Sequence, residues 1–371
     1  MIRLATVIET LEADLFRHYG PSLLACHRHA LTAIKHCRSA FSPRIEAQCE
    51  ACDEQIFVPH SCGHRFCPHC QAHESQRWLE PQRARLVPGE YFLLTFTLPA
   101  QCRPLARSHQ RVVYPLLMTS AWQTLHTFSQ NDRQMQGTPG AVAVLHTHSR
   151  PLEFHPHVHV LMPAVAFDAK RRLWRTKKPG QHGTGKSGYL FNHKALATVF
   201  RAKLLAALNA AGIALPKDYP AQWVVDCKSV GAGEKALVYL GRYLYRGVIR
   251  EQDILACTDG QVTFRYQNSK TRRMETRTLP GAEFLWLLLQ HVLPKGLQRT
   301  RNFGFLHPNS KRLIALLQVV FRMTNTKPPQ AMRPALVCPC CGAVMRIVRT
   351  RIPTHPAWPI HASAVGQGAA V

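Results

Sequence analysis

Three histidines on two neighbouring segments have the spacing of a metal site. His157 and His159 are separated by one residue at the start of an apolar segment, 157–163, that is typical of a β-strand. Because side chains alternate along a strand, both imidazoles point to the same face. His146 precedes His157 by 11 residues, and a hairpin would bring it beside the pair. The pattern predicts that His146, His157 and His159 bind one divalent cation.

Clustered cysteines predict a second kind of metal site nearer the N-terminus. Cys49 and Cys52 form one Cys-x-x-Cys pair, and Cys67 and Cys70 form another after 14 intervening residues. Four thiolates arranged tetrahedrally suit Zn²⁺. We expect these four cysteines to bind one structural zinc ion. A second ion or an exchanged ligand stays open, because further donors lie nearby: Cys37, His60, Cys62 and His64.

A third cysteine group lies near the C-terminus. Cys338 and Cys341, in a Cys-Pro-Cys-Cys-Gly string, are similar to half of a zinc ribbon, although no second pair follows them. His355 or His361 could complete such a site, or the pair could be a remnant.

The charge of the chain indicates a polyanionic partner. It has 47 Lys and Arg against 21 Asp and Glu, which gives a net charge of +26. A membrane partner is disfavoured, since the longest apolar stretch, 284–293, is too short to span a bilayer. Glu9, Glu12 and Asp14 stand where a signal peptide would need a basic and then an apolar segment. We expect a cytoplasmic, nucleoid-associated protein that binds DNA and no membrane.

Two tyrosines one helical turn apart could act as nucleophiles on that partner. Tyr239 and Tyr243 are four residues apart and share one face of a predicted helix. A tyrosine hydroxyl can attack a DNA phosphodiester, forming a phosphotyrosine and releasing a 3′-hydroxyl. The hydroxyl, with an ordinary pKa near 10, needs help, which a cation on the histidines would give by polarising the phosphate. A tyrosine pair at this spacing is also common in packed helices, so the histidines and the charge must support this interpretation.

Basic residues near these groups are candidate DNA contacts. The segment 170–178 has six basic residues in nine and reads as an exposed loop, with an aromatic ring that could stack on an unpaired base. Arg242 and Arg246 flank the tyrosines and could clamp phosphates. Both sets could instead be ordinary solvated charges. The residues predicted in the loop are Lys170, Arg171, Arg172, Trp174, Arg175, Lys177 and Lys178.

The elements that position these groups follow from hydrophobic periodicity. Alternation in 91–98 predicts a strand with one buried face, and the segments 141–147 and 157–163 predict an antiparallel hairpin. Strands are also expected at 223–228 and 261–266. Helices are expected at 6–18, 71–85, 105–129, 194–212, 234–250, 283–293 and 310–323. Strands and helices alternate irregularly, which favours an α+β fold with an antiparallel sheet flanked by helices and preceded by a small zinc-binding module. The expected domains are a lead-in, 1–25; the zinc-binding, DNA-binding module, 26–87; the nuclease, 88–326; and a Pro- and Ala-rich tail, 327–371.

Together the motifs resemble one protein family. The string His155-Pro-His-Val-His159 after His146, the segment Val238-Tyr-Leu-Gly-Arg-Tyr243 and the segment 290–296 are similar to the two-tyrosine rolling-circle transposases of bacterial insertion sequences, which belong to the HUH endonucleases. The segment 61–70 resembles the zinc-binding domain that precedes their nuclease. The resemblance covers roughly residues 25 to 345. It implies metal ligands at His157 and His159, nucleophiles at Tyr239 and Tyr243, and Mg²⁺ or Mn²⁺ as the working ion, while conjugative relaxases have a similar three-histidine spacing that includes His146.

The function predicted from the sequence is single-strand DNA cleavage and rejoining through a 5′-phosphotyrosine. The partners are the single-stranded element ends and the target, with host replication machinery extending the freed 3′-hydroxyl. The oligomeric state stays open, as does which tyrosine acts first. Alternatives are a plasmid relaxase or replication initiator with the same chemistry, and a non-catalytic zinc-dependent DNA-binding relic. A carboxylate-based nuclease is less favoured because the acids form no convincing cluster.

Overall fold

The protein consists of two units, each formed by segments that are distant in sequence. The structure is a computed structural model, and it describes residues 1–70, 72–178, 190–245, 248–268, 271–321 and 335–353. Of Tyr243 and Tyr245 it describes the backbone only. The first unit contains Met1–Arg77, Tyr245–Val292 and Pro329–Val371, and the second contains Trp78–Leu244 and Leu293–Pro328. The contiguous domains expected at 26–87, 88–326 and 327–371 differ from these units, because sheet pairing and helix packing join segments that the sequence separates.

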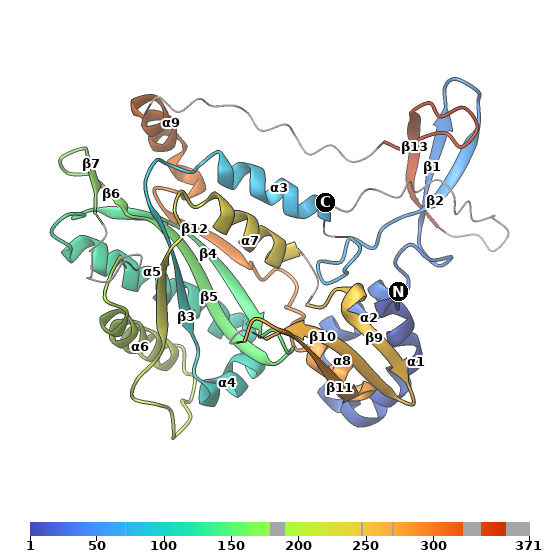
Figure 1. The fold of residues 1–371 in the computed structure, drawn as a ribbon, viewed down its shortest axis with the longest axis horizontal. Helices are drawn as coiled ribbons and strands as arrows, with labels where there is room; N and C mark the ends of the chain where they lie inside the picture. Colours follow the sequence, from blue (N-terminus) through green and yellow to red (C-terminus); the bar gives the residue numbers. More distant parts are fainter. Residues whose placement is uncertain (71, 179–189, 246–247, 269–270, 322–334, 354–371) are drawn as a thin grey trace. The chain divides into compact units, whose positions relative to one another are not determined.

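An antiparallel sheet forms the centre of the second unit (Figure 1). Its strand order is β7-β6-β4-β5-β3-β8, and β12 pairs with β4. The strands are β3 (Tyr91–Thr97), β4 (Thr138–His148), β5 (Phe154–Pro163), β6 (Val165–Asp168), β7 (Leu173–Thr176), β8 (Val225–Ser229) and β12 (Thr300–Gly304).

Helices pack against one face of this sheet and build the main core. They are α4 (Arg103–Ser108), α5 (Gln110–Asn131) and α6 (His193–Ala210), where the Asn192 side chain caps the first turn of α6. Alternate residues of the central strands enter this core because successive side chains point to opposite faces. They are Phe92, Leu94, Phe96, Ala141, Ala143, Leu145, Val158, Val160 and Met162. The intervening residues, among them the predicted metal ligands, therefore face the other side.

The opposite face of the sheet is covered by α7 (Glu234–Tyr245) (Figure 1). Leu237, Leu240 and Leu244 of this helix are buried, which fixes its rotation, and the Leu244 carbonyl accepts a hydrogen bond from Arg299 at 2.9 Å. The second unit also contains α9 (Lys311–Val320), and α3 (Ala72–Arg83) joins the two units in sequence.

Helices and a separate three-stranded sheet form one part of the first unit. Its helices are α1 (Leu4–Tyr19), α2 (Ala25–Lys35) and α8 (Gly281–Leu289), and its sheet has the order β11-β10-β9, from β9 (Ile254–Thr258), β10 (Gln261–Gln267) and β11 (Met274–Pro280). Gly281 lets α8 approach α1 closely, because a Cβ there would lie 2.4 Å from Leu11 Cδ1. The rings of Tyr19 and Trp286 stack with centroids 5.0 Å apart.

A small ribbon forms the other part of the first unit. Its order is β13-β1-β2, where β1 (Arg44–Cys49) and β2 (Gln55–Pro59) form a hairpin and β13 (Met345–Ile352) pairs antiparallel with β1. The last strand of the chain thus joins a sheet that begins near the N-terminus.

The expected α+β fold with an antiparallel sheet is confirmed, and several elements differ in detail. The helix expected over 105–129 is divided at His109, where the backbone leaves the helical region. The strands β9, β11 and β12 were not expected, because their sequences are polar or short. No helix among the described residues is long and apolar enough to cross a membrane.

Candidate active site and metal-binding clusters

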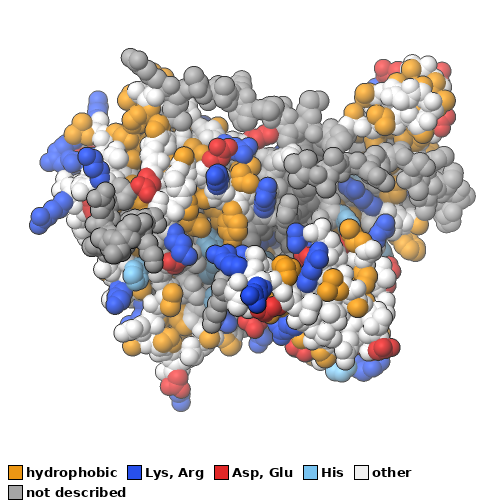
Figure 2. All heavy atoms as spheres, viewed as in Figure 1, with side chains coloured by type: hydrophobic (Ala, Val, Ile, Leu, Met, Phe, Trp, Pro, Cys, Tyr) orange, Lys and Arg blue, Asp and Glu red, His pale blue; other side chains and the backbone are white. Residues whose placement is uncertain are grey.

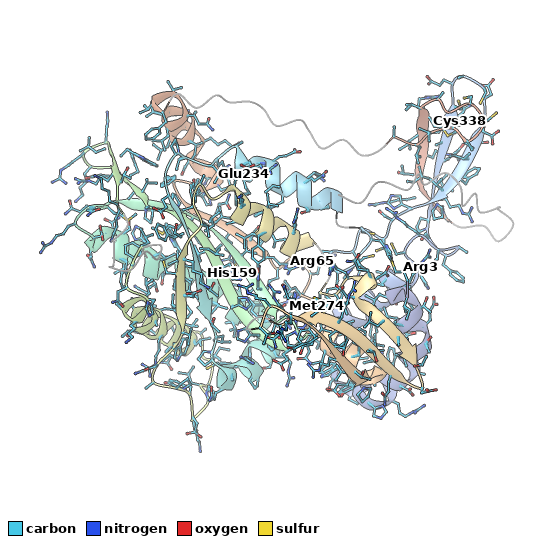
Figure 3. The ribbon with its side chains drawn as sticks, in the orientation of Figure 1. Arg3, Arg65, His159, Glu234, Met274 and Cys338 are labelled. Carbon is cyan, nitrogen blue, oxygen red and sulfur yellow. The ribbon has the colours of Figure 1, made fainter. Side chains whose placement is uncertain are left out.

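The three predicted histidines come together on the face of the sheet opposite the helical core. The β4–β5 register pairs His146 with His157 and Val144 with His159, so all three side chains lie on the same face. Each imidazole offers one ring nitrogen as a ligand atom, and these three nitrogens lie within 4.8 Å of one another. His146 is fully buried, and Figure 3 labels His159 on β5. The structure therefore brings together all three histidines that the sequence proposes as ligands.

Hydrogen bonds orient two of these rings. His157 Nδ1 lies 2.7 Å from the carbonyl oxygen of His155, and because a carbonyl only accepts, Nδ1 carries the proton there. His159 Nδ1 lies 2.9 Å from the Thr95 hydroxyl. Both contacts use Nδ1, which leaves Nε2 as the ligand atom, as in metal sites where a second partner orients the imidazole.

Burial keeps the three imidazoles neutral. It lowers the pKa of His157 to about 4 and that of His159 to about 3, and it holds the pKa of His146 well below its ordinary value. Neutral imidazole is the form that donates a lone pair to a metal ion. The cluster holds no carboxylate among the described residues, so its donor set is three neutral nitrogens.

Tyr239 lies beside the histidines. Its ring centroid is 6.3 Å from that of His159, with the rings nearly perpendicular, and its side chain is 45% exposed. Burial raises the pKa of its hydroxyl, and the positive charge of Arg150 acts in the opposite direction. The backbone of Tyr243 lies one turn further along α7, whereas its side chain and all of Arg246 are outside the described residues. Arg242 is solvent-exposed.

The cysteines form two groups of four where the sequence analysis expected one. Cys67 and Cys70 lie with Cys37 and Cys62, while Cys49 and Cys52 lie with Cys338 and Cys341. In each group the sulfur atoms are all within 4.8 Å of one another. The expected grouping of Cys49, Cys52, Cys67 and Cys70 is thus corrected. The reason is that the β1–β2 hairpin pairs with β13, which brings the C-terminal pair to it.

Family models and relatives match most of the chain. A "Transposase zinc-binding domain" model matches residues 7–98, and the Y2-type "Putative transposase" model matches residues 140–313, which include the histidines and tyrosines. The "Putative transposase y4qJ" of Sinorhizobium fredii is 33% identical over 325 residues, 79% of each chain. The "Transposase for insertion sequence element IS801" of Pseudomonas savastanoi is 25% identical over 76% of this chain and 68% of its own length.

The chain belongs to the IS91-type transposases of insertion sequences. A transposase is a DNA-processing enzyme, and its substrate is DNA. The zinc-binding domain model and the cysteine clusters agree in indicating Zn²⁺.

Two arginines that the sequence analysis did not assign lie near the histidines of the transposase. Arg150, in the turn between β4 and β5, is close enough to Tyr239 to influence its pKa. Arg103 Nη2 lies 2.5 Å from His155 Nδ1. The sequence Ser149-Arg-Pro is typical of a turn, but only the pairing of β4 with β5 shows that this turn lies near the histidines.

The basic segment 170–178 of the transposase is partly folded, whereas an exposed loop was expected. Residues 173–176 form β7, and the Trp174 ring packs against Phe305 with centroids 4.9 Å apart, so Trp174 is a packing residue here. Arg175 pairs with Asp168 at 3.3 Å, and Lys177 pairs with Asp132. Lys170, Arg171, Arg172 and Lys178 remain exposed, and Figure 2 shows Lys and Arg side chains gathered over the β6–β7 hairpin.

Proposed function

We propose that this transposase cleaves and rejoins single-stranded DNA at the ends of its element through a 5′-phosphotyrosine, with Tyr239 as a nucleophile. The observation that carries the proposal is the position of Tyr239, on the helix that covers the histidine face and next to His159. Its side chain is half exposed, so a DNA strand can reach it, while the buried leucines of α7 hold it in place.

The histidine cluster fits a divalent cation. Three neutral imidazoles supply three nitrogen donors, two of them the Nε2 atoms of His157 and His159, whose Nδ1 atoms are engaged elsewhere, and leave other coordination positions for phosphate oxygens. When bound, Mg²⁺ or Mn²⁺ would polarise the scissile phosphate and stabilise the charge that develops on it. His146, His157 and His159 would hold such an ion on the face of the sheet that α7 covers with Tyr239.

The reaction conserves the energy of the phosphodiester bond. The Tyr239 oxygen attacks phosphorus, the bond between phosphorus and the 3′-oxygen breaks, and the 3′-oxygen takes up a proton as the phenol loses its own to solvent. The freed 3′-hydroxyl can then be extended by host replication machinery. Tyr243, one turn along α7, serves the second strand transfer.

The other side chains bind DNA or maintain the fold. Lys170, Arg171, Arg172 and Lys178 contact the phosphate backbone at the β6–β7 hairpin, and Arg242 does so beside the tyrosines. Cys37, Cys62, Cys67 and Cys70 hold a structural Zn²⁺ within the matched zinc-binding domain. The sulfurs of Cys37 and Cys70 are 3.3 Å apart, near the sulfur–sulfur distance of about 3.8 Å in a tetrahedral zinc–thiolate site.

A denaturing-gel assay tests this proposal. Labelled single-stranded DNA from the ends of the parent element is incubated with the protein and Mn²⁺, Mg²⁺ or EDTA. We expect an adduct that survives denaturant, requires the metal and disappears when Tyr239→Phe and Tyr243→Phe are combined. Tyr219→Phe, a tyrosine of the same unit whose ring packs against Arg201, serves as the control and retains the adduct.

Two results would contradict the proposal. An adduct that persists in the double variant would assign the nucleophile elsewhere. Folded, zinc-loaded protein that forms no adduct with authentic ends would indicate a DNA-binding relic.

A further inference from the structure

The C-terminal cysteine pair lies against the β1–β2 hairpin although Cys52 and Cys338 are 286 positions apart in the sequence. Cys52 Sγ lies 3.5 Å from Cys338 Sγ, and Cys49 Sγ lies 3.5 Å from Cys341 Sγ. In a tetrahedral site with zinc–sulfur bonds of 2.3 Å, sulfur atoms are about 3.8 Å apart, whereas a disulfide needs about 2.05 Å. The sulfur arrangement therefore suits a shared metal ion rather than two disulfides.

The two Cys-x-x-Cys turns have the same backbone geometry. In the first, the Cys49 N–H donates to the Glu54 carbonyl at 2.8 Å, and in the second, the Cys338 N–H donates to the Ala343 carbonyl at 2.8 Å. Both bonds join a cysteine to the residue five positions further on. In each turn the residue that follows the second cysteine has a left-handed backbone, with φ 58° at Asp53 and 73° at Gly342.

Backbone amides in these turns point at the sulfur atoms. The amides of Ala51, Glu54 and Ala343 are hydrogen-bonded to the sulfurs of Cys49, Cys52 and Cys341, each from two residues further along the chain. Amide donors stabilise thiolate, which is the form that binds metal. The two turns share the bond that closes each turn and the amide donor to the second cysteine, and their four sulfurs together form a complete ligand set.

The ribbon has too small a core to hold its third strand by packing alone. Its buried hydrophobic residues are Ala47, Cys49, Ile56, Val58, Cys338 and Met345. Two ion pairs also join β13 to the hairpin: that of Arg346 with Glu50 is exposed on both sides and contributes little, whereas that of Arg349 with Glu46 joins an exposed arginine to a buried carboxylate. Units this small usually need a metal or a disulfide for stability.

We propose that Cys49, Cys52, Cys338 and Cys341 form a second four-thiolate zinc site, separate from that of Cys37, Cys62, Cys67 and Cys70. Figure 3 labels Cys338 at the ribbon. The ion fastens the third segment of the first unit to its first segment. The transposase then binds two structural zinc ions, and one of them depends on the C-terminal segment.

Zinc counting on the full-length protein tests this assignment. Zinc per chain is measured by inductively coupled plasma mass spectrometry after dialysis against EDTA. We expect C338S/C341S to lose one zinc relative to the unsubstituted protein, C37S/C62S to lose one, and the combination to lose two. The matched control is Cys340→Ser, which removes the exposed cysteine between the two ligands and leaves the zinc content unchanged.

Further measurements keep the assignment open to refutation. Because a serine variant could lose zinc through misfolding, Cys341→His, which restores a ligand, is expected to keep the zinc that Cys341→Ser loses. Unchanged zinc in C338S/C341S would overturn the proposal in favour of a single site at Cys49, Cys52, Cys67 and Cys70. Equal loss in Cys340→Ser would also overturn it. None of these readouts depends on DNA cleavage.

Discussion

Two histidines of the cluster are each oriented by a different partner. His157 depends on a backbone carbonyl, which no substitution removes, whereas His159 depends on the side chain of Thr95. Partners of this kind fix the orientation of a ligand and typically change metal affinity by roughly 10- to 100-fold. Thr95 is therefore a positioning residue that acts through His159.

Thr95→Val tests this role, because valine keeps the shape of threonine and removes its hydroxyl. We expect the Mn²⁺ concentration for half-maximal adduct to rise roughly 10- to 100-fold while the adduct level at saturating metal stays near that of the unsubstituted protein. Thr138→Val, at the end of β4 away from the histidines, is the control and should change this concentration less than twofold (~0.4 kcal/mol). Equal effects of the two substitutions would indicate a general loss of sheet stability.

Arg150 supplies a positive charge next to Tyr239. Since this charge opposes the effect of burial on the tyrosine pKa, Arg150→Ala should raise that pKa and make the hydroxyl a poorer nucleophile. We expect adduct formation to slow by roughly two- to tenfold, the range for one partly exposed charge. The measurement is the single-turnover rate at saturating metal.

Two further variants separate charge from shape at this position. Arg150→Lys keeps the charge and should restore most of the rate, while Arg133→Ala removes an exposed arginine that is not assigned to the site and should have no effect. A lysine variant as slow as the alanine variant would refute an electrostatic role.

The histidines were predictable from the sequence and the cysteine groups were not. Alternation along a strand requires His157 and His159 to share a face, and the short distance to His146 allows only a hairpin between them. Four cysteines in two close pairs, by contrast, fit one site as well as two. The choice between them depends on the pairing of β13 with β1, and sequence patterns do not reveal a pairing between segments so far apart in the chain.

At the scale of elements, β12 joins the sheet by pairing with β4, and this pairing includes a glycine that other residues cannot replace. Gly304 has φ 58°, and a Cβ there would lie 1.7 Å from the Pro139 carbonyl oxygen. The pairing of Gly304 with Gly140 thus requires both a left-handed backbone and a close approach of two strands.

Gly304→Ala should therefore destabilise the second unit by more than backbone strain alone. We expect the free energy of unfolding to fall by about 3 kcal/mol or more, measured by chemical denaturation. Gly212→Ala is the matched control, since Gly212 also has a positive φ, 70°, but has nothing within 4 Å of its added Cβ. It should cost about 1 kcal/mol. Similar losses in the two variants would show that the close contact at Pro139 relaxes.

Elements were predicted best where periodicity was strong. The strand and hairpin predicted at 91–98, 141–147 and 157–163 agree with β3, β4 and β5 to within a few residues, because their apolar residues alternate. The segment 170–178 was expected to be a loop because its many charged residues obscure the sequence pattern of a short strand. The short hairpin of β7 with β6 and the packing of Trp174 on Phe305 decide its conformation, and the second of these contacts is distant in sequence.

At the scale of the whole molecule, the net charge of +26 implies strong, salt-sensitive binding of DNA. Only part of that charge can contact DNA, because many basic side chains are already paired with acids, as Arg175 is with Asp168. The exposed basic residues of the β6–β7 turn, among them Lys170 and Arg172, are the ones that remain for phosphate contacts.

Replacing these two residues should change the salt dependence of binding in a predictable way. Each phosphate contact to a single strand contributes about 0.7 to the slope of log K against log salt concentration, so K170Q/R172Q should lower the slope by about 1.4 if both residues contact DNA. Fluorescence anisotropy with a labelled single strand measures it. The matched control, K311Q/R312Q, removes the same charge from exposed positions on α9 and should leave the slope unchanged. Equal changes in both variants would mean that the transposase attracts DNA through its overall charge, without a defined contact at the β6–β7 turn.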